Sequence, residues 1–355
     1  MPHYNSYDSF KTKKSIEKKN RAKSVSENKE ISSEFITREG SKESVGIVIE
    51  TSYRNAMVLY DGRIIEVFGM YKNIPCNQIV FPGDYVKIGA NQKNIEGVFE
   101  RKTILSREHR DSTRRSGVAT NKIIAVNIDS AIIVVSAYSP PLHPKFIDRY
   151  LMVLQDCGIE PIICLNKCDL KTDNDERILD IYRNLGVKVV ETSALNNIGI
   201  EELKECIKNK RAIFVGHSGV GKSSLTNKLL NNNEIKTGAV GEKSLKGRHT
   251  TTTSKYYEWA EGSSIIDTPG IRALDVSNIK ASEVQNFFSE FKDYLNCKYR
   301  TCDHVHIEKK DCGVKQAVER GDISFGRYDS YRRIIEEING ENAKKNGMSE
   351  DERIL

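Results

Sequence analysis

Residues 216–224 constrain the fold of this chain most strongly, because they have the spacing of a phosphate-binding loop. The segment fits the pattern G-x-x-x-x-G-K-S, with an apolar run before it at 212–215 and a helical pattern after it at 225–230. A strand, a tight turn and a helix are therefore predicted, with backbone N–H groups closing around an anion at the helix N-terminus. We assign to this nucleotide site Gly216, His217, Ser218, Gly219, Val220, Gly221, Lys222, Ser223 and Ser224.

The charge and composition of the chain leave several kinds of partner open. Its 355 residues suffice for two or three domains, and 55 Lys and Arg against 49 Asp and Glu give a net charge of +6. That charge permits a polyanionic partner without requiring one. We expect no membrane association, since no apolar run approaches the roughly 20 residues that cross a bilayer. Without the apolar core of a signal peptide, and with five scattered cysteines typical of a reducing compartment, a cytoplasmic location is expected.

Two polar extensions, residues 1–43 and 341–355, are expected to be disordered. The first is rich in Lys, Ser, Glu and Asn and has almost no apolar period. Its basic side chains could contact phosphates, but the acidic residues among them favour a solvated tail over that function or a transit peptide.

Residues 44–104 predict a small β-barrel of the oligonucleotide-binding (OB) type. Short β-rich runs follow one another at regular spacing, and Asp61-Gly62 between two of them signals a hairpin. A purely structural barrel is the alternative. Residues 105–122 form a basic linker, either solvated or in contact with nucleic-acid phosphates. The expected strands of the barrel are 45–49, 56–60, 64–68, 85–88 and 97–99.

From residue 123 to 280 the pattern changes to alternating strands and helices. Continuous apolar runs are typical of strands that are buried on both faces of a parallel sheet, and helical patterns separate them. We therefore predict a doubly wound α/β domain. Its strands are expected at 131–135, 161–165, 187–190, 212–215, 256–259 and 264–266, and its helices at 146–157, 174–185 and 200–209.

A guanine-binding motif ends one of these strands. The Asp169 carboxylate can accept two hydrogen bonds from the N1–H and N2–H₂ edge of guanine, a donor pair that adenine lacks. After the next strand, Ser193-Ala194 supplies a backbone amide for the guanine oxygen. The residues assigned to the base are Asn166, Lys167, Cys168 and Asp169, together with Ser193 and Ala194.

Downstream of the phosphate loop lie two segments that complete a GTPase site. Gly247–Thr253 suits a mobile switch, and one of its threonines, for which we take Thr251, would join Ser223 on Mg²⁺ in the GTP state. Asp267 would hold Mg²⁺ through water, and the Gly270 N–H would sense the γ-phosphate. Because the guanine motif precedes the phosphate loop, the order differs from a Ras-like domain and predicts a circular permutation.

Three clustered cysteines predict a structural zinc site. Cys297, Cys302 and Cys312 with one histidine meet the tetrahedral demand of Zn²⁺ and leave no open position for catalysis. We favour His304 as the fourth ligand, with His306 as the alternative. A disulfide with one free thiol is the competing interpretation. A helix at 281–294 precedes the cluster, and a helical tail at 314–338 follows it.

These motifs together resemble the RsgA (YjeQ) family of circularly permuted, ribosome-dependent GTPases. The match spans about residues 44–340 and implies an OB barrel, a GTPase domain at 123–280 and a zinc-binding helical domain at 281–340. It further implies binding to the small ribosomal subunit and its rRNA late in maturation, and GTP hydrolysis there. The family spacing leaves five residues between histidine and last cysteine, which fits His306, whereas His304 leaves seven. The zinc ligands carried over are Cys297, Cys302, His304 and Cys312.

One catalytic function, the orientation of the attacking water, has no obvious residue in the expected position. Ile271 follows Asp267-Thr-Pro-Gly270, where Ras-like enzymes often carry a water-positioning glutamine, and an apolar side chain cannot orient water. We therefore hypothesise that His249 takes this part when the ribosome orders the switch, with Lys222 neutralising phosphate charge. The alternatives are a GTP-dependent switch on a protein partner, an ATPase or kinase, and a purely structural zinc protein. We expect a monomer that binds GTP and GDP.

Overall fold

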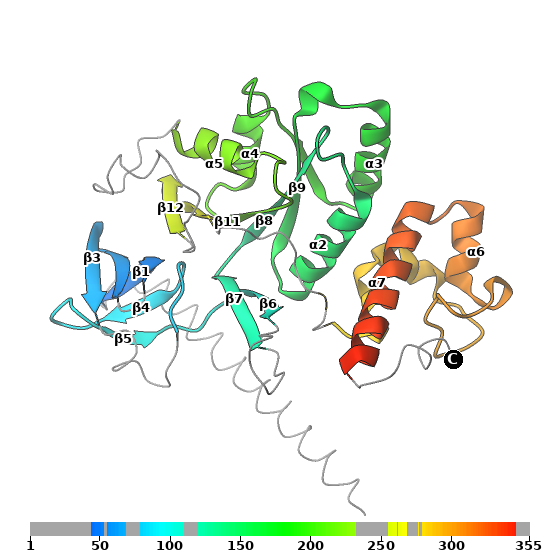
Figure 1. Cartoon of the computed structure of the whole chain (residues 1–355), viewed down its shortest axis with the longest axis horizontal. Coiled ribbons are helices and arrows are strands. Elements are labelled where there is room, and N and C mark those ends of the chain that lie inside the picture. The colour runs from blue at the N-terminus through cyan, green and yellow to red at the C-terminus, as the bar shows by residue number, and fades with distance from the viewer. Residues whose placement is uncertain are drawn as a thin grey trace, which may run out of the picture. The chain divides into compact units, whose positions relative to one another are not determined.

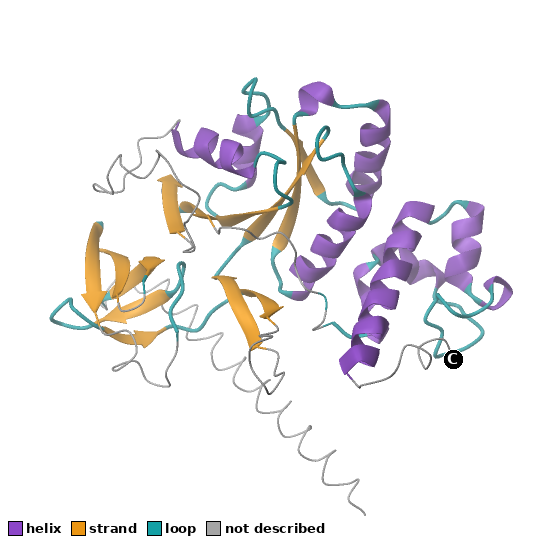
Figure 2. Ribbon diagram, in the orientation of Figure 1, coloured by secondary structure: helices purple, strands orange, loops and turns teal. Residues whose placement is uncertain are grey.

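The computed structural model describes the chain in several stretches (Figures 1 and 2). Contacts divide the chain into residues 1–44 and 45–355, and all elements below belong to the second unit. None of the helices that the structure describes has the length and apolar character that crossing a membrane requires. The described residues are 44–52, 55–68, 79–109, 120–231, 255–260, 262–267, 276 and 279–345.

A mixed sheet forms the centre of the predicted α/β domain. Its order is β10-β9-β8-β11-β13-β12, and all neighbouring pairs are parallel except β13 with β12. Parallel strands followed by one antiparallel strand, β12, fit a GTPase domain, and the sheet continues from β12 into the N-terminal strands. The strands are β8 (Ser130–Ser136), β9 (Glu160–Asn166), β10 (Lys188–Glu191), β11 (Arg211–Val215), β12 (Lys255–Ala260) and β13 (Ser263–Asp267).

Successive residues of the central strands bury their side chains on opposite faces of this sheet. Ile133 and Val135 of β8 join the core cluster that contains α2 and α3 side chains, whereas Ile132 and Val134 join the cluster of α4 and α5. Alternate residues of each strand thus pack against the helices on opposite faces of the sheet. Because both faces are covered, apolar side chains are favoured at consecutive positions of the strand, which explains the continuous apolar runs. The helices are α2 (Pro144–Asp156), α3 (Asp173–Asn184), α4 (Ile200–Cys206) and α5 (Lys222–Asn231).

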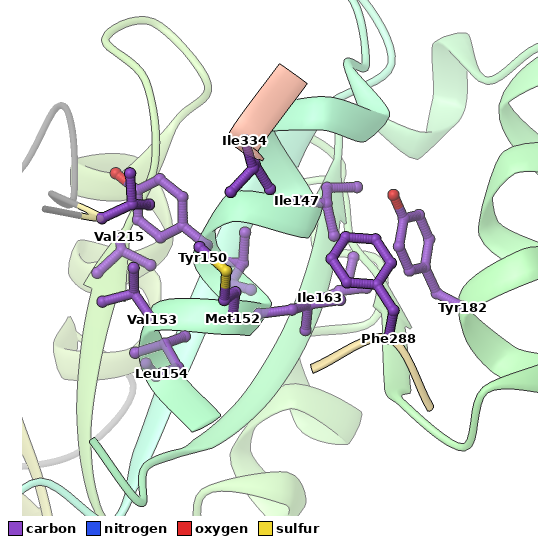
Figure 3. Packing of buried hydrophobic residues seen from close by; sticks show 14 of the residues in the cluster. Ile147, Tyr150, Met152, Val153, Leu154, Ile163, Tyr182, Val215, Phe288 and Ile334 are labelled. Carbon is purple, nitrogen blue, oxygen red and sulfur yellow. The ribbon is translucent and has the colours of Figure 1, made fainter. Parts of the chain in front are cut away.

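Helix α2 contributes most to the first of these cores. Figure 3 shows Ile147 and Met152 of α2 gathered with Ile163 of β9, Tyr182 of α3 and Phe288. Ile147, Tyr150 and Leu154 are fully buried, as the apolar positions at i, i+3 and i+7 of an amphipathic helix should be. This helix follows directly on the loop that leaves the carboxyl end of β8.

The N-terminal strands form a sheet in the order β3-β2-β1-β4-β5. Neighbours are antiparallel, and the hairpin predicted at Asp61-Gly62 joins β2 to β3, with Asp61 and Gly62 both at positive φ. The backbone N–H of Phe68, at the end of β3, donates to the carbonyl of Lys93 before β5. Strand β1 also pairs with β12 through Glu50 and Lys255. The bounds are β1 (Val45–Thr51), β2 (Asn55–Tyr60), β3 (Arg63–Phe68), β4 (Tyr85–Ile88) and β5 (Ile95–Val98).

The predicted basic linker is wrong in part, because its ends form a β-hairpin. Strands β6 (Ile104–His109) and β7 (Thr120–Val126) pair antiparallel in a separate two-stranded sheet. Leu105 and Ala125 oppose each other and are buried, which anchors this hairpin in the large core cluster. Charged residues next to these two apolar positions obscured the alternating pattern of the two strands in the sequence.

The C-terminal region is helical, but its segments differ from those predicted. The single helix expected at 281–294 is two 3₁₀ helices, η3 (Ala281–Phe287) and η4 (Ser289–Tyr294), because Phe288 between them leaves helical geometry with φ −109° and ψ 79°. The tail expected at 314–338 is divided into α6 (Gly313–Arg320) and α7 (Phe325–Lys345), with Gly321 at φ 83° ending the first. Helix α7 extends beyond residue 340. Two further 3₁₀ turns are η2 (Cys168–Leu170) and η5 (Lys309–Asp311).

Candidate nucleotide site and metal centre

The phosphate loop connects the carboxyl end of β11 to the first turn of α5. Gly216, Gly219 and Gly221 all have positive φ, which an L-residue adopts at a cost. A Cβ at Gly221 would lie 2.1 Å from the Asn166 amide nitrogen, so this position also has no room for a side chain. The ammonium of Lys222 donates to the carbonyls of Gly216 and His217, at 2.8 and 2.6 Å, and therefore lies over the loop. This is a cationic, glycine-lined turn at a helix N-terminus, which suits an anionic ligand.

Asn166 joins the three nucleotide motifs. Its side-chain amide donates to the carbonyl of Val220 in the phosphate loop, at 2.8 Å, and its Oδ1 accepts from the backbone N–H of Ala194 at 3.2 Å. The Thr192 hydroxyl also lies 3.3 Å from that oxygen. Asn166 is 2% exposed, so each of these bonds is made away from water. The structure thus brings together segments that are far apart in the sequence.

The rest of the guanine motif lies at the same edge of the sheet. Lys167 adopts the left-handed conformation, with φ 58°, and its ammonium donates to the carbonyls of Tyr138 and Ser139, both at 2.8 Å. Asp169 is exposed in η2, where its carboxylate is open to a ligand. On the neighbouring loop, Ser193 Oγ accepts from the backbone N–H of Asn196 at 3.2 Å, which holds the turn that presents Ala194.

The two motifs downstream of the phosphate loop are described only in part. Asp267 ends β13, the parallel neighbour of β11, so its carboxylate and Lys222 leave the same edge of the sheet. The Lys222 ammonium accordingly acts to lower the pKa of Asp267, although desolvation is the larger effect and raises it. His249, Thr251 and Gly270 lie outside the described residues, whereas Ser223 and Ser224 lie in the first turn of α5.

His217 packs against helix α2. Its ring lies on that of Phe146, with 4.1 Å between centroids, and desolvation, Lys222 and His143 in that order lower its pKa. A neutral imidazole is favoured there. The contact gives this loop side chain a packing role.

A second cluster brings together Cys297, Cys302, His304 and Cys312. The Nδ1 of His304 lies 3.5 Å from the sulfur of each cysteine, and Cys297 Sγ lies 3.9 Å from Cys312 Sγ. Around a tetrahedral Zn²⁺, with bonds of about 2.3 Å to sulfur and about 2.0 Å to nitrogen, these separations would be about 3.5 Å and about 3.8 Å. These four separations match tetrahedral zinc, and all four donor atoms lie within 4.8 Å of one another, so the cluster is compatible with a zinc site.

Burial favours the neutral forms of side chains in this cluster when no metal is bound. Burial, and then contact with Cys297 and Cys312, raises the pKa of Cys302 to about 12. Burial also raises the pKa of Cys312 and lowers the pKa of His304, which keeps the imidazole neutral as a metal ligand must be. A bound divalent cation would offset the charge of three thiolates and so allow the cysteines to lose their protons.

His306, the alternative zinc ligand, is directed away from this cluster. Its Nδ1 lies 2.5 Å from Asp303 Oδ2, and its side chain is 67% exposed. His304, by contrast, is 2% exposed and adopts the left-handed conformation with φ 61°. The residue spacing favoured His306, but the turn at Asp303–His304 places the other imidazole among the thiols.

Several residues that support these sites could not be identified from the sequence. The carbonyls of Tyr138 and Ser139 position Lys167, and Gln285 Oε1 lies 2.9 Å from His304 Nε2. The loop after β8 could have been found from its position, since it leaves the same edge of the sheet as the predicted motifs. Gln285 carries no such signal, because it belongs to a helix that was expected only to precede the cysteines.

Comparisons with known proteins agree with this geometry. Residues 98–277 match the model of the RsgA GTPase family. A protein of Klebsiella pneumoniae (strain 342) named small ribosomal subunit biogenesis GTPase RsgA is 40% identical over 281 residues, which cover 76% of this chain and 77% of the relative. A protein of the same name from Yersinia enterocolitica is 38% identical over 279 residues, with the same coverage.

Solved structures show the same likeness in three dimensions. YjeQ from Thermotoga maritima superposes with a TM-score of 0.64 at 30% identity, over 84% of this chain and 99% of that one. YloQ, described as a circularly permuted GTPase, gives a TM-score of 0.61 at 26% identity, over 86% of this chain and 98% of that one.

The fold and the nucleotide site therefore define a circularly permuted GTPase, in which the guanine motif precedes the phosphate loop along the chain and meets it through Asn166. The chain belongs to the RsgA GTPase family. It is an enzyme that hydrolyses GTP, as the sequence motifs predicted.

Proposed function

We propose that this GTPase binds the small ribosomal subunit during its late maturation and that GTP hydrolysis times its release. The observation that carries the proposal is the Asn166 contact with Val220 and Ala194, which brings the segments expected to bind guanine and phosphate together. The proteins that it resembles are named for biogenesis of the small ribosomal subunit. GTP would favour the bound state and GDP the released state.

The nucleotide roles follow from where the side chains lie. Asp169 would accept from the guanine edge, with Lys167 covering the base, and the turn at Ser193 and Ala194 would lie against the guanine oxygen. Lys222 would leave the Gly216 and His217 carbonyls for the β- and γ-phosphates. Ser223, Thr251 and Asp267 would hold Mg²⁺, which supplies charge neutralisation at the phosphates. Gly270 would sense the γ-phosphate.

We assign water orientation to His249. The residue that follows Gly270 is Ile271, which has no polar atom to hold water, and His249 adjoins the switch threonines. Ribosome binding would order this segment, so that the catalytic centre is completed only on the subunit.

The N-terminal strands would form an OB barrel that contacts rRNA. Support comes from the pairing of β1 with both β2 and β4, and from the Phe68–Lys93 hydrogen bond that brings β3 toward the β4–β5 hairpin. Contacts with rRNA phosphates predict binding that weakens steeply as salt rises. A protein partner would instead give little salt dependence.

The cysteine and histidine cluster would hold one structural Zn²⁺, since its four donor atoms match tetrahedral spacing. No ligand position remains for water, which excludes a hydrolytic role for this metal centre. With its cysteines reduced and its metal bound, the enzyme would work in the cytoplasm as a monomer.

The decisive experiment measures GTP turnover with and without purified small ribosomal subunits, with large subunits as the control. We expect strong stimulation by small subunits alone, and little turnover by Lys222→Ala under either condition. Turnover that neither subunit changes would overturn the ribosomal timer and favour a GTP-dependent switch on a protein partner. His249→Ala should lose the stimulated rate while keeping GTP affinity.

A further inference from the structure

The two nitrogens of the His304 ring have different surroundings. Nδ1 is 3.5 Å from three cysteine sulfurs, so it is the nitrogen that would ligate a metal ion. Nε2, on the far side of the ring, lies 2.9 Å from Oε1 of Gln285 in η3. A metal-bound Nδ1 carries no proton, and Nε2 must then carry the proton of the neutral ring. Gln285 must accordingly present its oxygen, which accepts, and not its NH₂ group.

We propose that Gln285 is the residue that positions the metal-binding histidine, by accepting the Nε2–H of His304. The inference rests on the zinc site of the proposed function. Gln285 lies before the first cysteine in the chain and outside the Cys and His pattern, so nothing in the metal motif identifies it. The acceptor fixes both the tautomer and the rotation of the ring. In a metal-binding histidine, the hydrogen bond of the nitrogen that does not bind the metal sets these two properties.

The other described neighbours of His304 do not accept a hydrogen bond from Nε2. The Tyr328 hydroxyl donates to the carbonyl of His304 at 2.8 Å, and the Tyr331 hydroxyl donates to the carbonyl of Asp303 at 2.9 Å. These two bonds hold the backbone of the turn to α7 but do not touch the ring nitrogens. The Phe291 ring lies 6.1 Å from the imidazole, centroid to centroid, at an interplanar angle of 84°, and its side chain has no oxygen or nitrogen that could accept from Nε2.

The same hydrogen bond makes η3 part of the metal centre. Val284 and Phe288, on either side of Gln285, are buried in the core cluster that also contains α2 side chains. A metal ion that fixes the His304 ring therefore also fixes the end of η3 that packs on the GTPase domain. Metal binding should stabilise this junction, and the junction should in turn raise the affinity for the metal.

The test measures zinc affinity of the full-length protein and three variants by competition with a chromophoric chelator at pH 7. Gln285→Leu keeps the size of the side chain without an acceptor, and we expect affinity lower by about 10- to 100-fold. Gln285→Glu keeps an acceptor and should stay within about threefold of wild type. Asn286→Ala, at the exposed neighbour on η3, is the matched control and should bind zinc as wild type does.

A second measurement observes the proton itself. In zinc-loaded wild type labelled with ¹⁵N-histidine, His304 should give a protected Nε2–H signal, which Gln285→Glu keeps and Gln285→Leu loses. Equal zinc affinity of Gln285→Leu and wild type would overturn the proposal, and so would an unprotonated Nε2 in the wild type. That second outcome is decisive even if Gln285→Leu fails to fold. A wild type that binds GTP but no zinc would refute the zinc site and this inference together.

Discussion

The side-chain amide of Asn166 donates to the backbone carbonyl of Val220 across 2.8 Å, and this bond ties the guanine motif to the phosphate loop. Both residues are buried, so neither group can exchange this bond for one with water. The same side chain accepts from the Ala194 N–H. One amide thus fixes the relative positions of the segments expected to hold the base and the phosphates.

Replacing Asn166 by Ala should weaken GTP binding by at least about tenfold and lower the free energy of unfolding by about 1–3 kcal/mol. The reason is that Val220 O and Ala194 N are left buried without their partner. Nucleotide affinity is measured by fluorescence titration and stability by urea denaturation. Asn196→Ala is the control, because Asn196 is exposed and its contact with Ser193 uses only the backbone N–H. Equal effects of the two substitutions would contradict the linking role.

Asp169→Asn should change which base the enzyme prefers. The amide offers one acceptor in place of two, and its NH₂ faces the guanine N2–H₂ donor, so GTP affinity should fall by about 100- to 1000-fold. Xanthosine triphosphate carries a carbonyl at that position, to which the new NH₂ can donate. Relative affinity for the two nucleotides, measured by competition, should therefore move toward xanthosine triphosphate. Asp173→Asn, in the exposed first turn of α3, should leave the preference unchanged.

The sequence predicted the strands of the GTPase domain, and it predicted at which strand ends the nucleotide motifs lie. Both depend on local sequence pattern. Each predicted strand from 131–135 to 264–266 matches an observed one, although the strand expected at 187–190 begins one residue before β10. The β6–β7 hairpin could not be predicted, since its pairing depends on the burial of Leu105 and Ala125 against a distant core. Propensity at 281–294 indicated one helix, whereas burial of Phe288 and Phe291 in the same core breaks it into two.

Contacts within the sites lie beyond sequence reasoning for a similar reason. Spacing alone allowed either His304 or His306 near the cysteines, and only the turn at Asp303 separates the two rings. The bond between Asn166 and Val220 needs the register of parallel strands, which no short-range pattern specifies.

Arg327→Met should lower the free energy of unfolding by about 3–5 kcal/mol. The guanidinium of this α7 residue donates to Asp148 of α2 and to Glu290, both at 2.6 Å, and its side chain is 5% exposed. Removing the cation leaves two acids without their partner, one of them wholly buried. Burial already raises the pKa of Asp148, with Arg327 opposing it, so the single variant should force that carboxyl to take up a proton.

A double variant separates charge from packing at this site. Asp148→Asn with Arg327→Met removes the buried acid together with its cation, so the two substitutions should cost less than the sum of the single ones. Arg333→Ala is the control, because its ion pair with Asp329 is exposed and should contribute less than about 1 kcal/mol. Urea denaturation measures the wild type, the two single variants, the double variant and the control, and a loss for Arg327→Met no larger than for Arg333→Ala would show that the pair is not stabilising.

Asp329 should make stability depend on pH on the acid side. Lys145 of α2 lies 2.7 Å from its carboxylate, Arg332 and Arg333 of α7 lie 2.8 and 3.2 Å away, and these cations hold the pKa of Asp329 well below its ordinary value of 3.8. Because the folded pKa is depressed, the contribution is present above about pH 4 and is lost as pH falls toward the folded value. Screening by solvent limits it to about 1 kcal/mol.

Asp329→Asn should therefore be less stable than wild type by about 1 kcal/mol at pH 7, and the difference should shrink as pH falls below about 4. Urea unfolding at pH 7, 5, 4 and 3 measures it, at low salt and again at high salt, where screening of the exposed cations reduces the gap. Asp293→Asn removes an exposed carboxylate of η4 without these partners and should change stability little at any pH. A gap for Asp329→Asn that stays constant from pH 7 to 3 would mean that its packing, and not its charge, stabilises the contact between α2 and α7.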